Sequence, residues 1–280
     1  MTEELKERLL ALADKYEVSS FCDQDPSQFL RWYSVGQAGT ELAGANATSA
    51  NVADIETAAF LASMLAFGNR KLFIPKIRSI LEMADKACGS FSRWLKSGTF
   101  KKDFPKGSEK FYRFYSYDDM QIFFEELAGL LEKAPSLGEY FKEAWCNQNS
   151  QLPQAAKTPQ QSTAPQSSPF LHTLISAAFP RSKIVPKGAN SANKRIHMFL
   201  RWMVRTNSAV DLGLWTWYNP ANLLIPLDVH VMQEAVQLGL LPPNASPSHR
   251  TALLLTKELS RAFPNDPARA DFSLFGLGVS

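Results

Sequence analysis

A run of basic residues and a later carboxylate are the features of this sequence best suited to chemistry. Residues 181–205 contain seven Lys or Arg and no Asp or Glu. On a helix of 3.6 residues per turn, residues 192–206 carry an apolar stripe, with Lys194, Arg201 and Arg205 on the opposite side. A cationic helix face suits nucleic acid, although basic runs are also typical of solvated helix surfaces. The pattern leaves both interpretations open.

The residues ahead of this helix predict a phosphate-binding turn. Gly188, Ser191 and Asn193 are typical of turns, and Lys183 and Lys187 add positive charge just upstream. At a helix start, unpaired backbone amides and the helix dipole favour an anion such as phosphate. The plainer interpretation is a polar loop before a solvated helix.

Asp228 lies in the string of residues 225–231, where Pro226 fixes the entry of the chain into an amphipathic helix. An Asp at a helix start is by default an N-cap. A carboxylate can also stabilise positive charge on a substrate or move a proton. The sequence allows either role.

Together, KGANSANKRIHMFLRWMV and PLDVHV resemble the helix-hairpin-helix DNA glycosylase superfamily, in which a hairpin ends in a lysine and the next helix begins with a Val/Leu-Asp-Thr/Val-His signature. The 34 positions between Lys194 and Asp228 are most similar to the archaeal 8-oxoguanine branch. KR-x5-RWMVR, DLG-x-W, PLDVHV and DP-x4-DF-x-LFGLG are similar to strings of a bacterial family of conserved hypothetical proteins. The hairpin departs from the superfamily's usual Leu-Pro-Gly-Val-Gly.

The resemblance implies an all-α fold of the helix-hairpin-helix glycosylase type, with two helical subdomains and a cleft between them. It implies a base-excision repair glycosylase with abasic-site lyase activity, acting on an oxidised purine such as 8-oxoguanine in double-stranded DNA. Lys194 would attack the sugar and form a Schiff base, and Asp228 would stabilise the developing charge or move a proton. Arg195 and Arg201 would favour the neutral lysine, and His230 would hold a phosphate. The predicted DNA contacts are Lys183, Lys187, Gly188, Ser191, Asn193, Arg195, Arg201, Arg205 and His230.

A base pocket is also implied, because the base must rotate out of the duplex to be excised. Asp271 and Phe275 share a helix face four residues apart, as do a polar residue and a stacking aromatic in the 8-oxoguanine branches. Each has a plainer role, as a surface carboxylate and a core ring. The predicted pocket comprises Asn69, Arg70, Met198, Trp215, Trp217, Asp271 and Phe275. The alternative function is a non-catalytic DNA-binding or lesion-sensing protein of the same fold.

Helical periodicity runs through most of the chain, and β-branched alternation is scarce. Besides helices at the N-terminus and over 54–68, we expect helices at about 71–86, 88–97, 117–134, 137–146, 170–178, 192–206, 228–240, 248–263 and 267–277. Residues 36–53 and 147–169 are expected to be loops. The second loop predicts a division into an N-terminal helical subdomain, 1–146, a flexible insertion, 147–169, and the hairpin-containing subdomain, 170–280, with the first and last helices able to pack together.

Composition limits the class of protein. The chain has 280 residues, 45% of them hydrophobic and 20% charged, which is typical of a globular protein. No apolar run approaches the roughly 18 residues that suggest a membrane span. Cys22, Cys88 and Cys146 lack the spacing of a zinc or iron–sulfur site. We therefore expect a cytoplasmic, nucleoid-associated monomer that needs no metal or cofactor.

Overall fold

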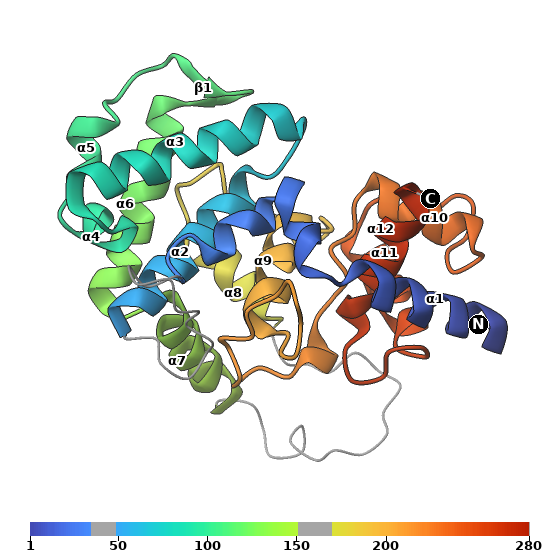
Figure 1. The fold of residues 1–280 in the computed structure, drawn as a ribbon. Coiled ribbons are helices and arrows are strands. Elements are labelled where there is room, and N and C mark those ends of the chain that lie inside the picture. Colours follow the sequence, from blue (N-terminus) through green and yellow to red (C-terminus); the bar gives the residue numbers. More distant parts are fainter. Residues whose placement is uncertain (35–48, 151–169, 280) are drawn as a thin grey trace.

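The computed structural model describes residues 1–34, 49–150 and 170–279, and helices dominate these ranges (Figure 1). The prediction of a mainly helical chain is confirmed. One short antiparallel hairpin joins β1 (Lys110–Tyr112) to β2 (Tyr115–Ser116). The α-helices are α1 (Glu3–Tyr16), α2 (Ser49–Leu65), α3 (Arg70–Cys88), α4 (Phe91–Lys96), α5 (Phe100–Asp103), α6 (Tyr117–Lys133), α7 (Leu137–Ser150), α8 (Leu171–Ala177), α9 (Lys194–Val204), α10 (Val229–Gln237), α11 (His249–Leu259) and α12 (Ala270–Val279). Short 3-10 turns are η1 (Ser19–Gln24), η2 (Pro26–Arg31), η4 (Pro220–Asn222) and η5 (Pro267–Arg269).

Each expected helix overlaps an observed one, but two loop boundaries were wrong. Helix α2 begins at Ser49, inside the loop expected over 36–53. Alanines in this first part of α2 favour a helix over a loop. Helix α7 extends to Ser150, four residues into the expected insertion. The remaining parts of these loops, 36–48 and 151–169, lie outside the described residues.

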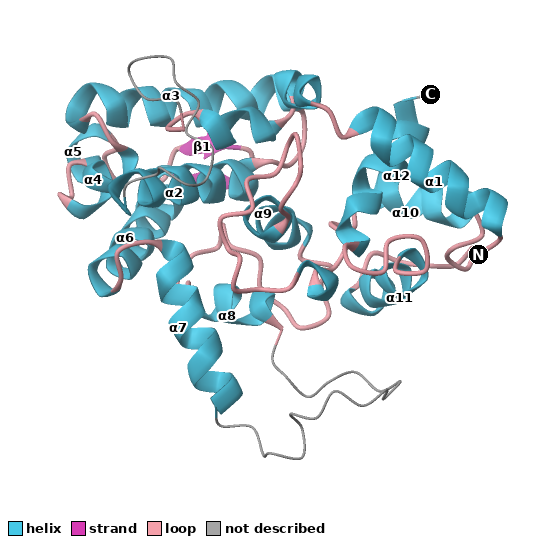
Figure 2. Cartoon of the chain, turned by 60° about the horizontal axis from the view of Figure 1, so that its bottom comes forward, coloured by secondary structure: helices cyan, strands magenta, loops and turns pink. Residues whose placement is uncertain are grey.

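Two hydrophobic cores divide the molecule into two lobes (Figure 2). The large lobe comprises the described parts of residues 26–223 and is built mainly from helices α2–α9. Its core contains rings such as Phe60 and Phe199, whose centroids lie 5.0 Å apart. The small lobe contains α1, α10, α11 and α12 around residues such as Leu9 and Leu255. The division expected at 147–169 is therefore wrong, because the apolar stripe of α9 packs into the core of the N-terminal helices.

Both ends of the described chain contribute to the small lobe. Helices α1 and α12 lie side by side (Figures 1 and 2). The Ser273 hydroxyl donates a hydrogen bond to the Leu9 carbonyl at 2.6 Å. The small lobe therefore brings together segments more than 250 residues apart.

A buried ion-pair network joins α9 to the small lobe. Arg205 contacts the carboxylates of Glu17 at 2.7 Å and Asp266 at 2.8 Å, and it also pairs with Asp211. Arg201 pairs with Asp211 at 3.3 Å and with Asp271. Burial opposes the charge on Arg205, but the surrounding carboxylates outweigh it and raise its pKa. The two guanidinium groups are therefore permanently charged interior links between the lobes.

Three histidines meet where α8, α9 and α11 come together. His172, His197 and His249 each place a ring nitrogen within 4.8 Å of the other two. Burial lowers the pKa of His172 to about 4, and it lowers the pKa of His197 well below its usual value. These imidazoles are therefore neutral at pH 7.

Acidification is expected to destabilise the folded protein through these histidines. The pKa of histidine is near 6.5 in the unfolded chain, whereas the pKa of native His172 is about 4. Between these pH values the unfolded chain binds a proton that the native chain does not. The contribution of neutral His172 to the free energy of unfolding is therefore complete above pH 6.5 and is lost as the pH falls toward 4. The loss from His172 alone amounts to about 3 kcal/mol. Urea unfolding between pH 7.5 and 4.5 measures this loss, and His172→Gln should weaken the dependence of the free energy of unfolding on pH. The control His230→Gln, at an exposed histidine, should leave that dependence as it is in the wild type. A wild-type pH dependence in His172→Gln would contradict the assignment to His172.

Candidate active site

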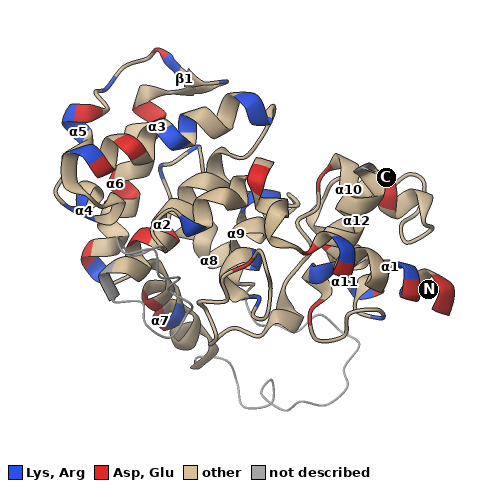
Figure 3. Ribbon diagram, in the orientation of Figure 1, with Lys and Arg blue, Asp and Glu red and all other residues tan. Residues whose placement is uncertain are grey.

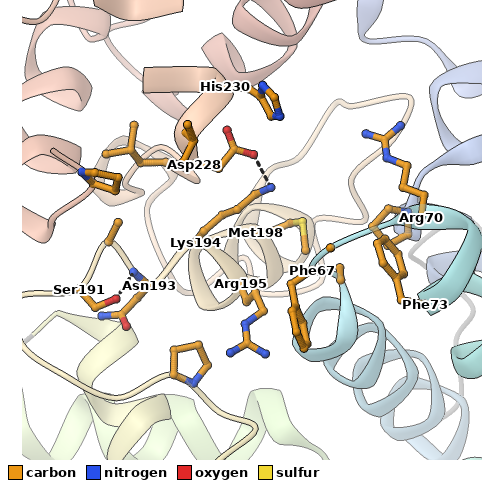
Figure 4. Close-up of a pocket in the computed structure, with 18 of the residues that line it drawn as sticks. Phe67, Arg70, Phe73, Ser191, Asn193, Lys194, Arg195, Met198, Asp228 and His230 are labelled. Carbon is orange, nitrogen blue, oxygen red and sulfur yellow. Dashed lines mark hydrogen bonds and ion pairs between the residues drawn. The ribbon is translucent and has the colours of Figure 1, made fainter. Parts of the chain in front are cut away.

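Lys194 and Asp228 face one another across the space between the lobes (Figure 4). The Lys194 Nζ lies 2.6 Å from the Asp228 Oδ2, in a combined hydrogen bond and ion pair. The two side chains are 37% and 27% exposed, respectively. The pair is therefore fixed in geometry and still reachable by a substrate.

Two helix starts place this pair. Lys194 is the first residue of α9, and Asp228 is the N-cap of α10, where its Oδ1 accepts from the Val231 amide at 2.8 Å. Burial tends to raise the pKa of Asp228, but Lys194 and the Val231 amide lower it below its usual value. Asp228 is therefore an ionised carboxylate at neutral pH, with one oxygen capping the helix and the other on the lysine.

The turn before α9 ends in an unusual backbone conformation. Asn193, the N-cap, has φ +46°, and its side-chain amide donates to the Gly188 carbonyl at 3.3 Å. The backbone amide of Asn193 donates to the Ser191 hydroxyl at 3.3 Å. The first amides of α9 have no partner within the helix, and neither do those of α10. The positive end of α9 therefore lies beside Lys194, whereas the start of α10 is already capped by the Asp228 carboxylate.

The space around the pair is a cleft of about 830 Å³ with walls from both lobes. An adjoining hollow of about 390 Å³ extends toward α12. The lining residues common to both are Asp25, Arg70, Lys194, Met198, Asp228 and His230. The two volumes are in the range of sites for small organic molecules, so a single base could enter the smaller one.

Predicted phosphate contacts fall in two places. Ser191, Asn193, Arg195 and His230 line the cleft. The expected contacts of the upstream turn, Lys183, Lys187 and Gly188, are exposed but are not among the lining residues. Lys183 lies 3.6 Å from Asp119, and the Lys187 ammonium donates to the Pro180 carbonyl at 2.6 Å. Arg195 donates to the Met64 carbonyl, with its guanidinium 5.0 Å from the Phe67 ring centre.

Arg205 lines neither the cleft nor the smaller hollow, so the expectation that it contacts DNA is wrong, whereas Arg201 does line the smaller hollow. Each residue is 2% exposed, and both are held in the ion-pair network. The helical wheel separated two faces correctly, but the face opposite the apolar stripe packs against the small lobe. Because carboxylates neutralise Arg201, its expected influence on the Lys194 amine is also unsupported.

Part of the predicted base pocket comes together in the smaller hollow. Arg70, Met198, Asp271 and Phe275 line it beside Lys194 and Asp228. Burial raises the pKa of Asp271, and the Arg201 guanidinium opposes that shift. The Phe275 ring lies 5.9 Å from the Arg70 guanidinium.

The other predicted pocket residues lie elsewhere. Asn69 is the N-cap of α3, accepting from the Lys71 amide at 2.9 Å, and it is not a lining residue. Trp215 was wrongly placed in the pocket, because it is 1% exposed and its indole donates to the Glu56 carboxyl at 2.8 Å. Trp217 stacks on Trp215, with ring centres 5.5 Å apart, and was also wrongly placed. Burial raises the pKa of Glu56 to about 7, even though Trp215 opposes the shift.

Sequence reasoning missed the wall formed by the segment between α1 and α2. Phe21 and Asp25 line the smaller hollow, and Asp25 lies 3.6 Å from Arg70. The Asp25-Pro26 pair signals a helix start, and the Asp25 side chain does accept from the Ser27 amide at 3.0 Å. No local signal linked that start to the cleft.

Basic and acidic residues are interspersed over both lobes (Figure 3). The cations at the cleft are Arg70, Lys194 and Arg195, with the carboxylates of Asp25 and Asp228 between them. None of the described helices is long and apolar enough to cross a membrane.

The fold and site define a two-lobed helical protein with a lysine–aspartate pair in the cleft between the lobes. Residues 46–280 match the model of a family described as a protein of unknown function, DUF2400, and the chain belongs to that family. No curated protein and no solved structure matched the chain.

Proposed function

We propose that this protein is a DNA glycosylase of the helix-hairpin-helix type, with abasic-site lyase activity toward an oxidised purine such as 8-oxoguanine. The observation that carries the proposal is the 2.6 Å contact between Lys194 and Asp228 in an accessible cleft. The sequence strings that resemble the superfamily contain both residues, and 34 intervening residues do not by themselves bring such groups together.

The cleft supports binding of a nucleic-acid backbone. The N-terminus of α9 lies there, and its amides and dipole favour phosphate, whereas Asp228 already caps the start of α10. Ser191 and His230 add hydrogen-bonding groups, and Arg70 is half-exposed with only a 3.6 Å contact to Asp25. A strand lying across the cleft would place its sugar near Lys194.

The adjoining hollow supports the entry of a rotated base. Asp271 offers a carboxylate oxygen to a purine N–H, and Phe275 offers a ring for stacking. Both lie on α12, while Met198 closes the hollow from α9. The reacting sugar would then be held between Lys194 and Asp228.

The proposed reaction uses the lysine as nucleophile. The Lys194 Nζ bonds to C1′ as the C1′–base bond breaks, and the electron pair leaves with the base, which takes up a proton. Ring opening gives a Schiff base, from which strand cleavage follows. The ammonium must first lose a proton, and the Asp228 Oδ2 is the acceptor within reach. That proton would pass from Asp228 to the departing base, which restores the carboxylate opposite the positive charge that develops on the sugar.

Strand scission and salt-dependent binding test this function. A duplex containing 8-oxoguanine should be cut at the lesion, and an undamaged duplex should not. Affinity should fall steeply as salt rises, because phosphate contacts release counterions. Absence of cleavage on both 8-oxoguanine and abasic duplexes would overturn the proposal, and salt-insensitive binding would also exclude a DNA-binding role.

Asp228→Asn is expected to slow excision about 10²- to 10⁴-fold, the usual contribution of a positioned acid–base group. The amide oxygen can still accept from the Val231 amide, so α10 should keep its cap and DNA affinity should change little. Single-turnover excision and binding assays measure the two effects separately. Glu258→Gln, in an exposed pair on α11, is the matched control and should retain full activity. Wild-type rates in Asp228→Asn would exclude the carboxylate from the reaction.

A further inference from the structure

The three histidines at the meeting point of α8, α9 and α11 have the donor set of a metal site. His172 and His197 are buried at 3% and 2% exposure, and His249 is partly exposed at the first position of α11. Their ring nitrogens lie within 4.8 Å of one another. Four-coordinate zinc with Zn–N distances near 2.05 Å places its nitrogens about 3.3 Å apart. Modest rotations of the three rings would bring their nitrogens to that separation.

His197 supplies an independent observation. Both of its ring nitrogens are buried and have no hydrogen-bond partner among the described residues, and the Nδ1 of His249 is likewise unpaired. Buried polar groups in native proteins are almost always satisfied by a partner, water or an ion. A nitrogen without a hydrogen-bond partner is also the atom that a metal ion would take as its ligand.

The surroundings suit a metal site with three imidazole ligands. The ring centres of His172 lie 4.7 Å from His197 and 5.0 Å from His249, and the Phe170 ring lies against His172 and His249. No carboxylate belongs to this cluster, which disfavours hard cations such as Mg²⁺ or Ca²⁺. Imidazole ligands instead suit zinc and its neighbours.

We propose that His172, His197 and His249 bind one Zn²⁺-like transition-metal ion that ties the small lobe to the large lobe. Two ligands come from large-lobe helices and the third from α11 of the small lobe. The His249 amide also donates to the Asn190 carbonyl at 2.9 Å, so the ion would anchor the turn that leads into Lys194. This inference stands apart from the proposed glycosylase reaction, because none of the three histidines lines the cleft.

Zinc titration of chelator-treated protein tests the proposal. Isothermal calorimetry with ZnCl₂ should give one site per chain, and saturating zinc should raise the melting temperature, because the ion binds the folded chain. His249→Asn should weaken zinc binding at least 100-fold. This position is chosen because its side chain is partly exposed, so the substitution leaves the core packed.

Two further variants keep the outcome decisive. His230→Asn removes the remaining histidine of the chain, which lies outside the cluster, and should bind zinc as the wild type does. His197→Gln, checked for helical content by circular dichroism, should lose binding with the fold retained. Absence of binding in the wild type, equal affinity in His249→Asn, or loss of binding in His230→Asn would each overturn the site.

Discussion

Lys194→Gln is expected to abolish borohydride trapping of the protein on duplexes that contain 8-oxoguanine or an abasic site. Trapping requires an amine that forms an imine with C1′, and an amide cannot form one. Glutamine can still donate a hydrogen bond toward Asp228, which lies 2.6 Å from the native ammonium. DNA affinity should therefore change only by the loss of one positive charge. A gel that separates the covalent complex from free protein measures the effect.

The matched control is Lys187→Gln. This exposed lysine lies in the same basic segment, but it donates to the Pro180 carbonyl and does not line the cleft. It should trap as the wild type does. Trapping that persists in Lys194→Gln would assign the nucleophile to another amine.

Partial results separate the alternatives. If only the abasic duplex traps, lyase chemistry stands and 8-oxoguanine is not the substrate. If nothing traps while salt-sensitive binding persists, the non-catalytic DNA-binding function replaces the proposed one.

Arg205→Met is expected to destabilise the fold by about 3–5 kcal/mol, the usual cost of removing one partner from a buried ion network. The Arg205 side chain is 2% exposed, and its loss leaves the carboxylates of Glu17, Asp211 and Asp266 close together without their shared cation. Methionine fills similar volume, so charge dominates the effect. Urea unfolding at pH 7 measures the change.

A pH series distinguishes charge from packing. Without Arg205, the buried carboxylates would have pKa values above those of the unfolded chain. Lowering the pH should therefore neutralise them and reduce the difference in free energy of unfolding between Arg205→Met and the wild type. Arg261→Met is the control, because its guanidinium is 54% exposed beside Glu258, and it should cost less than about 1 kcal/mol. If the difference in free energy of unfolding between Arg205→Met and the wild type stays constant with pH, lost packing causes the effect instead.

The sequence predicted most helices because periodicity is local information. The helix end expected at residue 68 and the start expected at residue 267 lie near observed boundaries, since Gly68 adopts φ +82° before α3 and Pro267 opens η5. The placement of Lys194 and Asp228 at helix starts followed from the same kind of signal. Their 2.6 Å contact did not, because it depends on how the lobes pack.

The errors have one physical cause, which is long-range pairing. A helical wheel cannot distinguish a solvated arginine from one neutralised in the interior, and Arg205 meets Glu17 and Asp266 from segments far away in sequence. The Trp215 indole likewise donates a hydrogen bond to Glu56, which lies 159 positions earlier in the sequence. The histidine cluster was missed because its three members follow no short spacing motif.

The pairing of α1 with α12 has a consequence for synthesis of the chain on the ribosome. The described parts of residues 26–223 can collapse around their own core as soon as they emerge, whereas α1 cannot pack until α12 has been made. Such distant contacts are slow to form, because a long loop must close first. The nascent chain therefore carries Lys194 well before the lobe that holds Asp228 is complete. A competent cleft arises only after α12 has been synthesised, so chains that stop before α12 would lack the hollow that this helix lines.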